Sequence, residues 1–111
     1  MQDKVMKNPR IEKKPGCVAA AAAIMGNKWT ALMILELASG EKRFSEIQAH
    51  LPGMSPRTLS QRLDELEATK IITKKSFAEA PPRVVYTLTQ KGQDLIPILK
   101  SMADWGTKYH Q

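Results

Sequence analysis

The sequence predicts one small, mostly α-helical domain with a single β-hairpin in its second half. Its 111 residues suffice for one hydrophobic core. Apolar residues recur at spacings of three and four along most of the chain, as on the buried face of a helix. Residues 71–88 change to a spacing of two, on both sides of the segment AEAPP, which indicates two strands and a turn.

The numbers of charged residues, cysteines and histidines indicate which classes of partner and function fit the sequence. The chain has 17 Lys and Arg against 11 Asp and Glu, a formal net charge of +6, which favours nucleic acid or an anionic membrane surface as partner. One cysteine excludes an intrachain disulfide, and with two histidines it forms no zinc-ligand cluster, so we expect neither metal nor cofactor. Since no apolar run could span a bilayer and no signal-peptide pattern is visible, we expect a cytoplasmic protein without a membrane partner.

The first third of the chain predicts an arm and two helices. Residues 1–16 carry five basic side chains and two prolines, which predicts a flexible basic arm before a domain spanning residues 17–111. The alanine run Ala19–Ala23 predicts a first helix suited to close packing, with Gly26 as its stop. A second helix, capped by Asn27 and ending by Gly40, is apolar over most of its surface and is expected to be the central core helix.

A short helix and a tight turn come next. Ser45 and Gln48 have the spacing of a capping box that opens a short helix, and Pro52-Gly53 ends it. The following helix begins with Ser55 as its N-cap and Pro56 as its first residue, where a missing N–H costs nothing. Its core stripe consists of Leu59, Leu63 and Leu66.

The last third predicts the hairpin and a final helix. Residues 71–77 and 83–88 are the two strands, and most of their charged side chains are basic. Thr89 caps the final helix, in which Pro97 is expected to cause a kink. The apolar face of this helix consists of Leu95, Ile98, Leu99, Met102, Trp105 and Tyr109.

A short helix, a tight turn and an N-capped helix form a helix-turn-helix, and the basic hairpin behind it predicts a winged helix-turn-helix. In such folds the amino-terminal residues of the second helix read base edges in the major groove. Arg57 and Gln61 lie opposite the leucine stripe, and the first carboxylate of this helix is Asp64. Because phosphates repel carboxylates, the sequence predicts that this end of the helix contacts double-stranded DNA.

The predicted DNA contacts fall into two groups. Arg57 and Gln61 have the donors and acceptors that read guanine and adenine. The other candidates suit phosphates or flanking bases, and they are Lys42, Arg43, Ser45, Ser55, Thr58, Arg62, Lys74, Lys75 and Arg83. Plainer explanations stay open, because a Ser-Pro start serves any helix and lysines also keep an edge strand soluble. A winged helix used only for protein interaction is therefore the alternative.

Residues 17–106 resemble the HxlR-type winged-helix transcription regulators of bacteria, relatives of the MarR group. The matching motifs are GNKW at 26–29, RFSEI at 43–47, LPGMSPRTLSQRLDELE at 51–67, PPRVVYTLT at 81–89 and Asp104-Trp105-Gly106. The resemblance implies a regulator, expected to be a repressor, that binds a pseudo-palindromic operator as a homodimer built from its first and last helices. A domain this small cannot cover the apolar face of its final helix alone, which agrees with a homodimer. The predicted interface consists of Val18, Leu95, Ile98, Leu99, Met102 and Trp105.

Cys17 is the candidate sensor residue. Several HxlR-type regulators resemble redox or electrophile switches with a cysteine just before the first helix, where Cys17 is expected to lie. Preceding lysines and a helix amino terminus both favour the thiolate, and a small electrophile, oxidant or other inducer would then be a partner. The alternative is a small residue packed at the dimer seam. An enzyme is not expected, since neither His50 nor His110 is marked as a base partner for Cys17.

Overall fold

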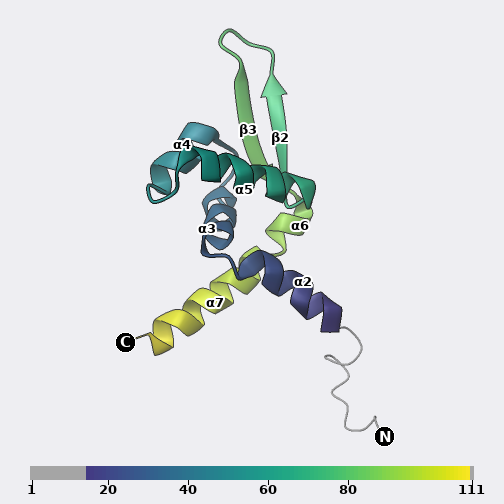
Figure 1. Ribbon diagram of the computed structural model, residues 1–111, viewed down its shortest axis with the longest axis vertical. Helices are drawn as coiled ribbons and strands as arrows, with labels where there is room; N and C mark the ends of the chain where they lie inside the picture. Colours follow the sequence, from purple (N-terminus) through teal and green to yellow (C-terminus); the bar gives the residue numbers. More distant parts are fainter. Residues whose placement is uncertain (1–14, 111) are drawn as a thin grey trace, which may run out of the picture.

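The computed structural model describes residues 15–110, with side chains from Val18 onward, so the predicted arm up to residue 14 lies outside the described residues. The fold is the predicted mostly helical winged helix-turn-helix. Its elements are α2 (Pro15–Met25), α3 (Lys28–Leu37), β1 (Lys42–Arg43), α4 (Phe44–His50), α5 (Pro56–Ala68), β2 (Ile72–Phe77), β3 (Arg83–Leu88), α6 (Gln90–Gln93) and α7 (Ile96–Tyr109). The β2–β3 wing projects from one end of the helical body, and α2 and α7 lie at the other end (Figure 1).

Side-chain caps start α3 and α5 where the sequence predicts them. Asn27 Oδ1 accepts hydrogen bonds of 2.9 and 3.1 Å from the second and third N–H groups of α3. Ser55 Oγ accepts the N–H of Thr58 at 3.1 Å at the start of α5. These caps satisfy N–H groups that a helix leaves without an internal partner. Both predicted starts are confirmed.

The short helix α4 has a different cap from the predicted one. Its N-cap is Arg43, whose N–H donates to Glu46 Oε1 at 2.8 Å, and Ser45 lies inside the first turn. The predicted capping box of Ser45 and Gln48 is therefore wrong. Lys42 and Arg43 form the extended strand β1, so the helix begins immediately after Arg43.

The wing belongs to a three-stranded antiparallel sheet with the order β1-β3-β2, whereas the sequence predicts two strands. β2 and β3 pair without interruption from Ile72 opposite Leu88 to Phe77 opposite Arg83. β1 pairs with the other edge of β3 through two residues. Two residues are too few to show a period, so no sequence pattern indicates β1.

The carboxyl-terminal segment is two helices, not one kinked helix. Thr89 caps α6 by accepting the N–H of Gly92 at 3.1 Å, as predicted, but α6 ends at Gln93. α7 begins at Ile96 with Pro97 in its first turn. The predicted kink at Pro97 is wrong because proline fits the first turn of a helix, where its missing N–H needs no partner. The helix is interrupted at residues 94–95 instead.

One hydrophobic core joins α3, α4, α5, α7 and the sheet. Its members include the predicted leucine stripe of α5, Met33 and Ile34 of α3, and Ile47 of α4. Burial of each such side chain contributes about 1.5–3 kcal/mol relative to exposure. Leu99 of α7 is 3% exposed and belongs to this core. The core therefore packs against one face of α5 and leaves the opposite face exposed to solvent.

Candidate nucleic-acid interface

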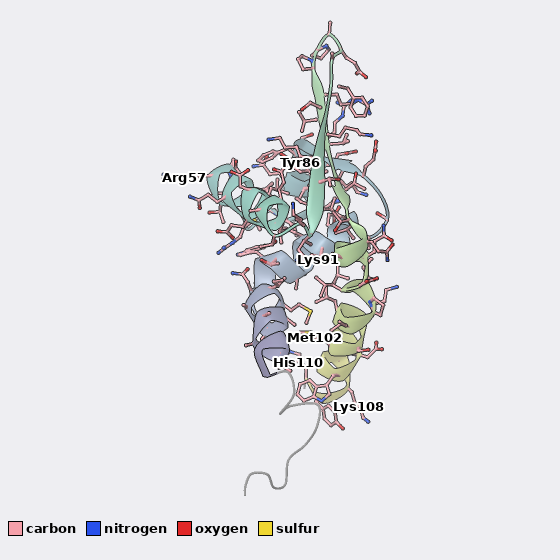
Figure 2. The ribbon with its side chains drawn as sticks, turned by 90° about the vertical axis from the view of Figure 1, so that its right-hand side faces the viewer. Arg57, Tyr86, Lys91, Met102, Lys108 and His110 are labelled. Carbon is pink, nitrogen blue, oxygen red and sulfur yellow. The ribbon has the colours of Figure 1, made fainter. Side chains whose placement is uncertain are left out.

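The amino-terminal half of α5 presents cationic and amide side chains to solvent. Arg57 and Gln61 are exposed, whereas Leu59 and Leu63 on the opposite side are fully buried. Arg57 points away from the body near the free end of the helix (Figure 2). The first carboxylate of α5, that of Asp64, lies beyond the second turn. Side-chain charge and the helix macrodipole therefore both make this end positive.

Two of the predicted contacts at the start of α5 also organise the helix. The Ser55 hydroxyl donates to Thr58 Oγ1 at 3.0 Å while it accepts the N–H of the same residue. Ser55 is exposed and Thr58 is half-buried. Both hydroxyl groups therefore lie at the exposed amino-terminal end of α5, where they hydrogen-bond within the helix cap.

Arg62 faces the body of the protein, not the exposed face of α5. Its guanidinium donates to Glu65 Oε1 at 2.9 Å, and its Nε is buried without a hydrogen-bond partner among the described residues. Arg62 lines a hollow of about 260 Å³ together with Asn27 and Thr30 of α3. Arg62, predicted to contact a phosphate or a flanking base, is therefore engaged within the protein, unlike the exposed Arg57 and Gln61.

Strand β1 brings the basic residues before α4 into one sheet with those of the wing. Two adjacent rows across the sheet have a cation on each outer strand and a buried residue of β3 between them. These rows are Lys42–Tyr86–Lys74 and Arg43–Val85–Lys75. The two cations of a row belong to strands about 10 Å apart.

Most of these cations are free to meet a ligand. Arg43, Lys74 and Lys75 are exposed, and so is Ser45 in the first turn of α4. Lys42 is half-buried and its Nζ donates to Ser39 Oγ at 2.9 Å. The sheet thus adds exposed cations to those of α5.

Arg83 is engaged inside the wing. Its guanidinium donates to Glu79 Oε2 at 3.2 Å, lies 3.9 Å from a carboxylate oxygen of Glu41, and stacks 4.0 Å from the centre of the Phe77 ring. Phe77 and Arg83 are also the last pair of the β2–β3 ladder. Arg83 therefore closes the base of the wing tip, and its DNA contact stays a prediction.

The acidic half of α5 lies beside the inner face of the wing. Burial raises the pKa of the Tyr86 hydroxyl above its ordinary value of 10.0, Lys74 opposes this shift, and Asp64 and Glu67 add to it. Electrostatic influence of this kind requires close approach. The carboxylates of α5 are thus grouped near a lysine of the wing, away from the exposed Arg57 end.

α3 supports the helix-turn-helix at two points that the sequence does not indicate. The Trp29 ring packs on Gly53 in the turn between α4 and α5, where an added Cβ would lie 2.9 Å from Cη2 of the ring. Glu36 of α3 hydrogen-bonds His50 Nδ1 at the end of α4. In the sequence the Pro-Gly dipeptide predicts the turn, but it does not indicate the contact of the turn with Trp29.

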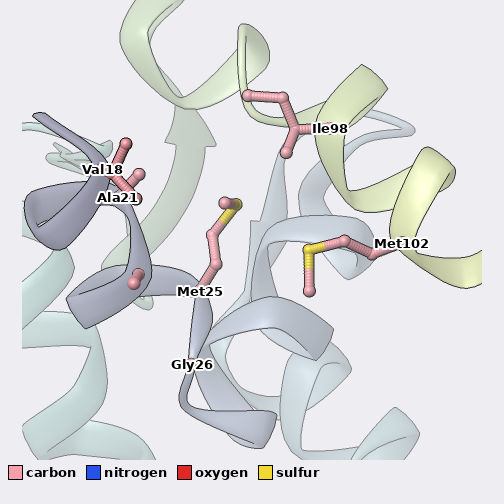
Figure 3. Close-up of a pocket in the computed structure, with 7 residues that line it drawn as sticks. Val18, Ala21, Met25, Gly26, Ile98 and Met102 are labelled. Carbon is pink, nitrogen blue, oxygen red and sulfur yellow. The ribbon is translucent and has the colours of Figure 1, made fainter. Parts of the chain in front are cut away.

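An apolar groove lies between α2 and α7, at the far end from the wing. It has a volume of about 510 Å³, and its lining includes Val18, Ala21, Met25, Gly26, Ile98 and Met102 (Figure 3). Val18, Ile98 and Met102 are 63%, 45% and 47% exposed, and Trp105 is 68% exposed further along α7. Of the predicted interface residues, Val18, Ile98 and Met102 therefore line one apolar groove. Trp105 is exposed elsewhere on α7, whereas Leu99 is buried in the core and Leu95 is half-buried.

Cys17 is the third residue of α2, which begins at Pro15, so it lies inside the first turn and not just before the helix as predicted. Its side chain lies outside the described residues. Across residues 15–110, no group of three or more His, Cys, Asp or Glu side chains is arranged to hold a metal ion. In the same range no single helix is long and apolar enough to cross a membrane; only the pair Val18–Met25 and Lys28–Leu37, bent by 83°, passes by length and composition.

Comparison with known proteins adds four similarities. The family HxlR-like helix-turn-helix matches residues 24–111. The chain is 42% identical over 101 residues to the HTH-type transcriptional regulator YvaP of Bacillus subtilis (strain 168), covering 91% of this chain and 87% of YvaP. The redox regulator HypR in its oxidized form has a TM-score of 0.78 and 33% identity, covering 85% of this chain and 97% of HypR. Quinone-bound YodB from B. subtilis has a TM-score of 0.74 and 32% identity, covering 85% and 99%.

Proposed function

Since the chain belongs to the HxlR-like helix-turn-helix family of transcriptional regulators, we propose that it acts by binding a specific site in double-stranded DNA. The exposed amino-terminal half of α5, free of carboxylates, carries this proposal. The major groove of B-DNA is about 12 Å wide and admits an α-helix. The positive end of α5 would enter the groove, and its acidic half would leave it.

Base reading is assigned to Arg57 and Gln61. A guanidinium can donate two hydrogen bonds to guanine, and a glutamine amide can both donate to and accept from adenine. Each such contact discriminates against a wrong base by about 1–3 kcal/mol. Ser55 and Thr58 flank these residues and are assigned to phosphates or neighbouring bases.

The sheet is assigned to the phosphate backbone. Lys42, Arg43, Lys74 and Lys75 lie in its two cationic rows, and Ser45 is the second residue of α4. Such contacts fix the orientation of a protein on the duplex without reading its sequence. Arg62 and Arg83, which are engaged by Glu65 and Glu79, are assigned to the shape of the protein and not to DNA contact.

We assign the groove between α2 and α7 to a second copy of the chain. The exposed apolar residues Val18, Ile98, Met102 and Trp105 lie on these two helices, and nothing else in the described chain covers them. A two-fold axis would give each protomer the same contacts and would place the two α5 helices about 34–36 Å apart, one turn of DNA. The operator would then be pseudo-palindromic.

The proposed result of binding is repression, since a dimer on a promoter excludes the polymerase. Deletion of the gene should raise the output of a reporter driven by the recovered operator. Lower output after deletion would make the protein an activator.

DNA binding can be tested by selecting sites from a random duplex pool and titrating salt on the enriched site. With about 6–10 phosphate contacts, affinity should fall roughly 10³–10⁵-fold between 50 and 200 mM salt. Arg57→Ala should relax preference at one position of each half-site, and Lys100→Ala on α7 is the control that removes a distant charge. A protein-interaction module would enrich no site and show no preference over random DNA.

Cys17 is proposed as an electrophile- or oxidant-responsive residue. The support is its place in the first turn of α2 and the likeness to structures described as oxidized HypR and quinone-bound YodB. The thiolate would add to a quinone or be oxidised, changing a residue at the helix that lines the groove. Quinone or diamide should alter operator affinity of the parent protein and leave Cys17→Ser unchanged. Equal responses in both proteins would exclude this role.

A further inference from the structure

The carboxyl end of α5 is closed by a sharp reversal of the chain. Lys70 has a φ of +64°, a conformation that a residue with a side chain seldom adopts. The N–H of Ile71 returns to the Leu66 carbonyl at 2.9 Å, as in helices that end with a left-handed residue. The carbonyl groups of residues 69–71 then point outward and need other donors.

α6 supplies these donors. The Thr89 hydroxyl donates to the Lys70 carbonyl at 2.6 Å, and the Thr89 N–H donates to the Ile71 carbonyl at 2.9 Å. Lys91 Nζ donates to the Thr69 carbonyl at 2.7 Å. A lysine ammonium at this place also faces the negative end of the α5 macrodipole. Three consecutive carbonyls at the end of α5 are thus bound by residues 89–91.

The approach of the two segments is too close for a side chain at the contact. Gly92 is buried, and a Cβ there would lie 2.3 Å from the Ile71 carbonyl oxygen and 3.0 Å from Leu88 Cδ2. Glycine is therefore required for room, and the backbone of α6 rests directly on the α5–β2 connection. This contact leaves little freedom for α6 to slide along α5.

α6 also leads directly into α7, which begins three residues after Gln93. Figure 1 shows α6 between the carboxyl end of α5 and the start of α7, and Figure 2 places Lys91 at this junction. A rotation of α7 relative to α5 therefore strains the contact between α6 and residues 69–71, in addition to the packing of α7 on α3. The orientation of the surface assigned to dimerisation is thus tied to that of the helix assigned to DNA.

We propose that Lys91 is a positioning residue that fixes α5 relative to α7 and so sets the separation of the two α5 helices in the dimer. The effect of Lys91 on the dimer rests on the proposed function, but the angle between α5 and α7 is a property of a single chain. Lys91 itself is exposed, and its ammonium is committed to the Thr69 carbonyl. Losing that bond would loosen the junction without opening the core.

The direct test measures the distance between α5 and α7 within a single chain. Spin labels are attached to Ser60→Cys and Ser101→Cys, two exposed positions on these helices, in a Cys17→Ser background. Labelled protein is diluted with excess unlabelled protein, so that only pairs within a chain are seen. Lys91→Met should broaden the distance distribution, Lys91→Arg should restore it because a guanidinium also donates to a carbonyl, and Lys100→Met should leave it unchanged.

A second measurement links the junction to DNA. On operators whose half-sites are moved apart or together by one or two base pairs, the parent protein should prefer one spacing, and Lys91→Met should lose about fivefold of that preference. A merely destabilised protein would lose affinity equally at all spacings. Distance distributions that match in Lys91→Met and Lys100→Met would overturn the proposal. Absence of any preferred site in the parent protein would instead refute the proposed function and leave the distance test intact.

Discussion

Arg83 and Lys74 each place one positive charge on the wing, but in different surroundings. The Arg83 side chain is 26% exposed, bound to Glu79 at 3.2 Å and stacked 4.0 Å from the Phe77 ring centre. Lys74 is exposed and forms no ion pair within residues 15–110. We therefore expect Arg83→Ala and Lys74→Ala to differ in the salt dependence of DNA binding, although both remove the same charge.

The magnitudes follow from the contacts. A lysine that neutralises one phosphate adds about 0.9 to the slope of log affinity against log salt. Between 50 and 200 mM salt, Lys74→Ala should therefore reduce the total affinity change by about 3.5-fold. Arg83→Ala should keep the slope and instead lose wing stability, since one exposed ion pair and one cation–π contact together contribute about 1–2 kcal/mol.

The assay is fluorescence anisotropy on one labelled operator at five salt concentrations, with urea unfolding of the free proteins beside it. Glu79→Gln is the matched control, because it removes the partner of Arg83 without removing a cation. In urea unfolding it should lower stability in the same direction as Arg83→Ala, and it should leave the salt slope as in the parent. Equal losses of slope in Arg83→Ala and Lys74→Ala would show that Arg83 leaves Glu79 to contact a phosphate, and the assignment would be wrong.

Three further predictions concern the fold. Gly92→Ala should destabilise the protein by about 1–3 kcal/mol because its Cβ would lie 2.3 Å from the Ile71 carbonyl oxygen, whereas Gly106→Ala, with nothing within 4 Å, should gain up to about 1 kcal/mol of helix propensity. Urea unfolding that ranks the two variants in the opposite order would contradict this packing. Asn27→Ala should cost about 0.5–2 kcal/mol in the same assay, and no loss would mean that its cap is not formed in solution. Because burial raises the pKa of Tyr86 above 10.0, the stability contributed by its neutral form is complete below pH 10 and is lost as the pH rises through the raised pKa. Parent protein should thus lose more stability than Tyr86→Phe as the pH rises from about 10 to 11, and parallel pH profiles would refute the burial.

The elements that the sequence predicts correctly are those whose signals are local. Asn27 and Ser55 each bind N–H groups within three residues of themselves, so the cap and the helix are visible in one short segment. The leucine stripe of α5 and the β2–β3 hairpin repeat over enough residues to show their periods. The exposed placement of Arg57 and Gln61 follows from the same helix geometry.

The structural features that the sequence does not indicate at β1, Leu99 and Arg83 depend on contacts that local patterns do not show. β1 exists because Lys42 and Arg43 pair with β3, forty residues later in the chain, and this strand moves the start of α4. Leu99 fits an exposed stripe by spacing, yet it faces the core because α7 packs on α3. Arg83 pairs with Phe77 in the β2–β3 ladder, so the register of the hairpin indicates that the two side chains can stack. A list of basic residues does not contain this information.

The short reach of β1 has a mechanical consequence for the wing. β1 pairs with Val85 and Tyr86 only, so the ladder beyond them, from Ser76 to Phe77, has a neighbour on one side alone. The two residue pairs beyond β1 span about 7 Å, so a tilt of about 10° there displaces the last pair by about 1 Å. The wing is thus stiff at its base and more compliant at its tip. Grooves that differ in width by about an ångström can be followed by bending, without disturbing the helices at the base of the wing.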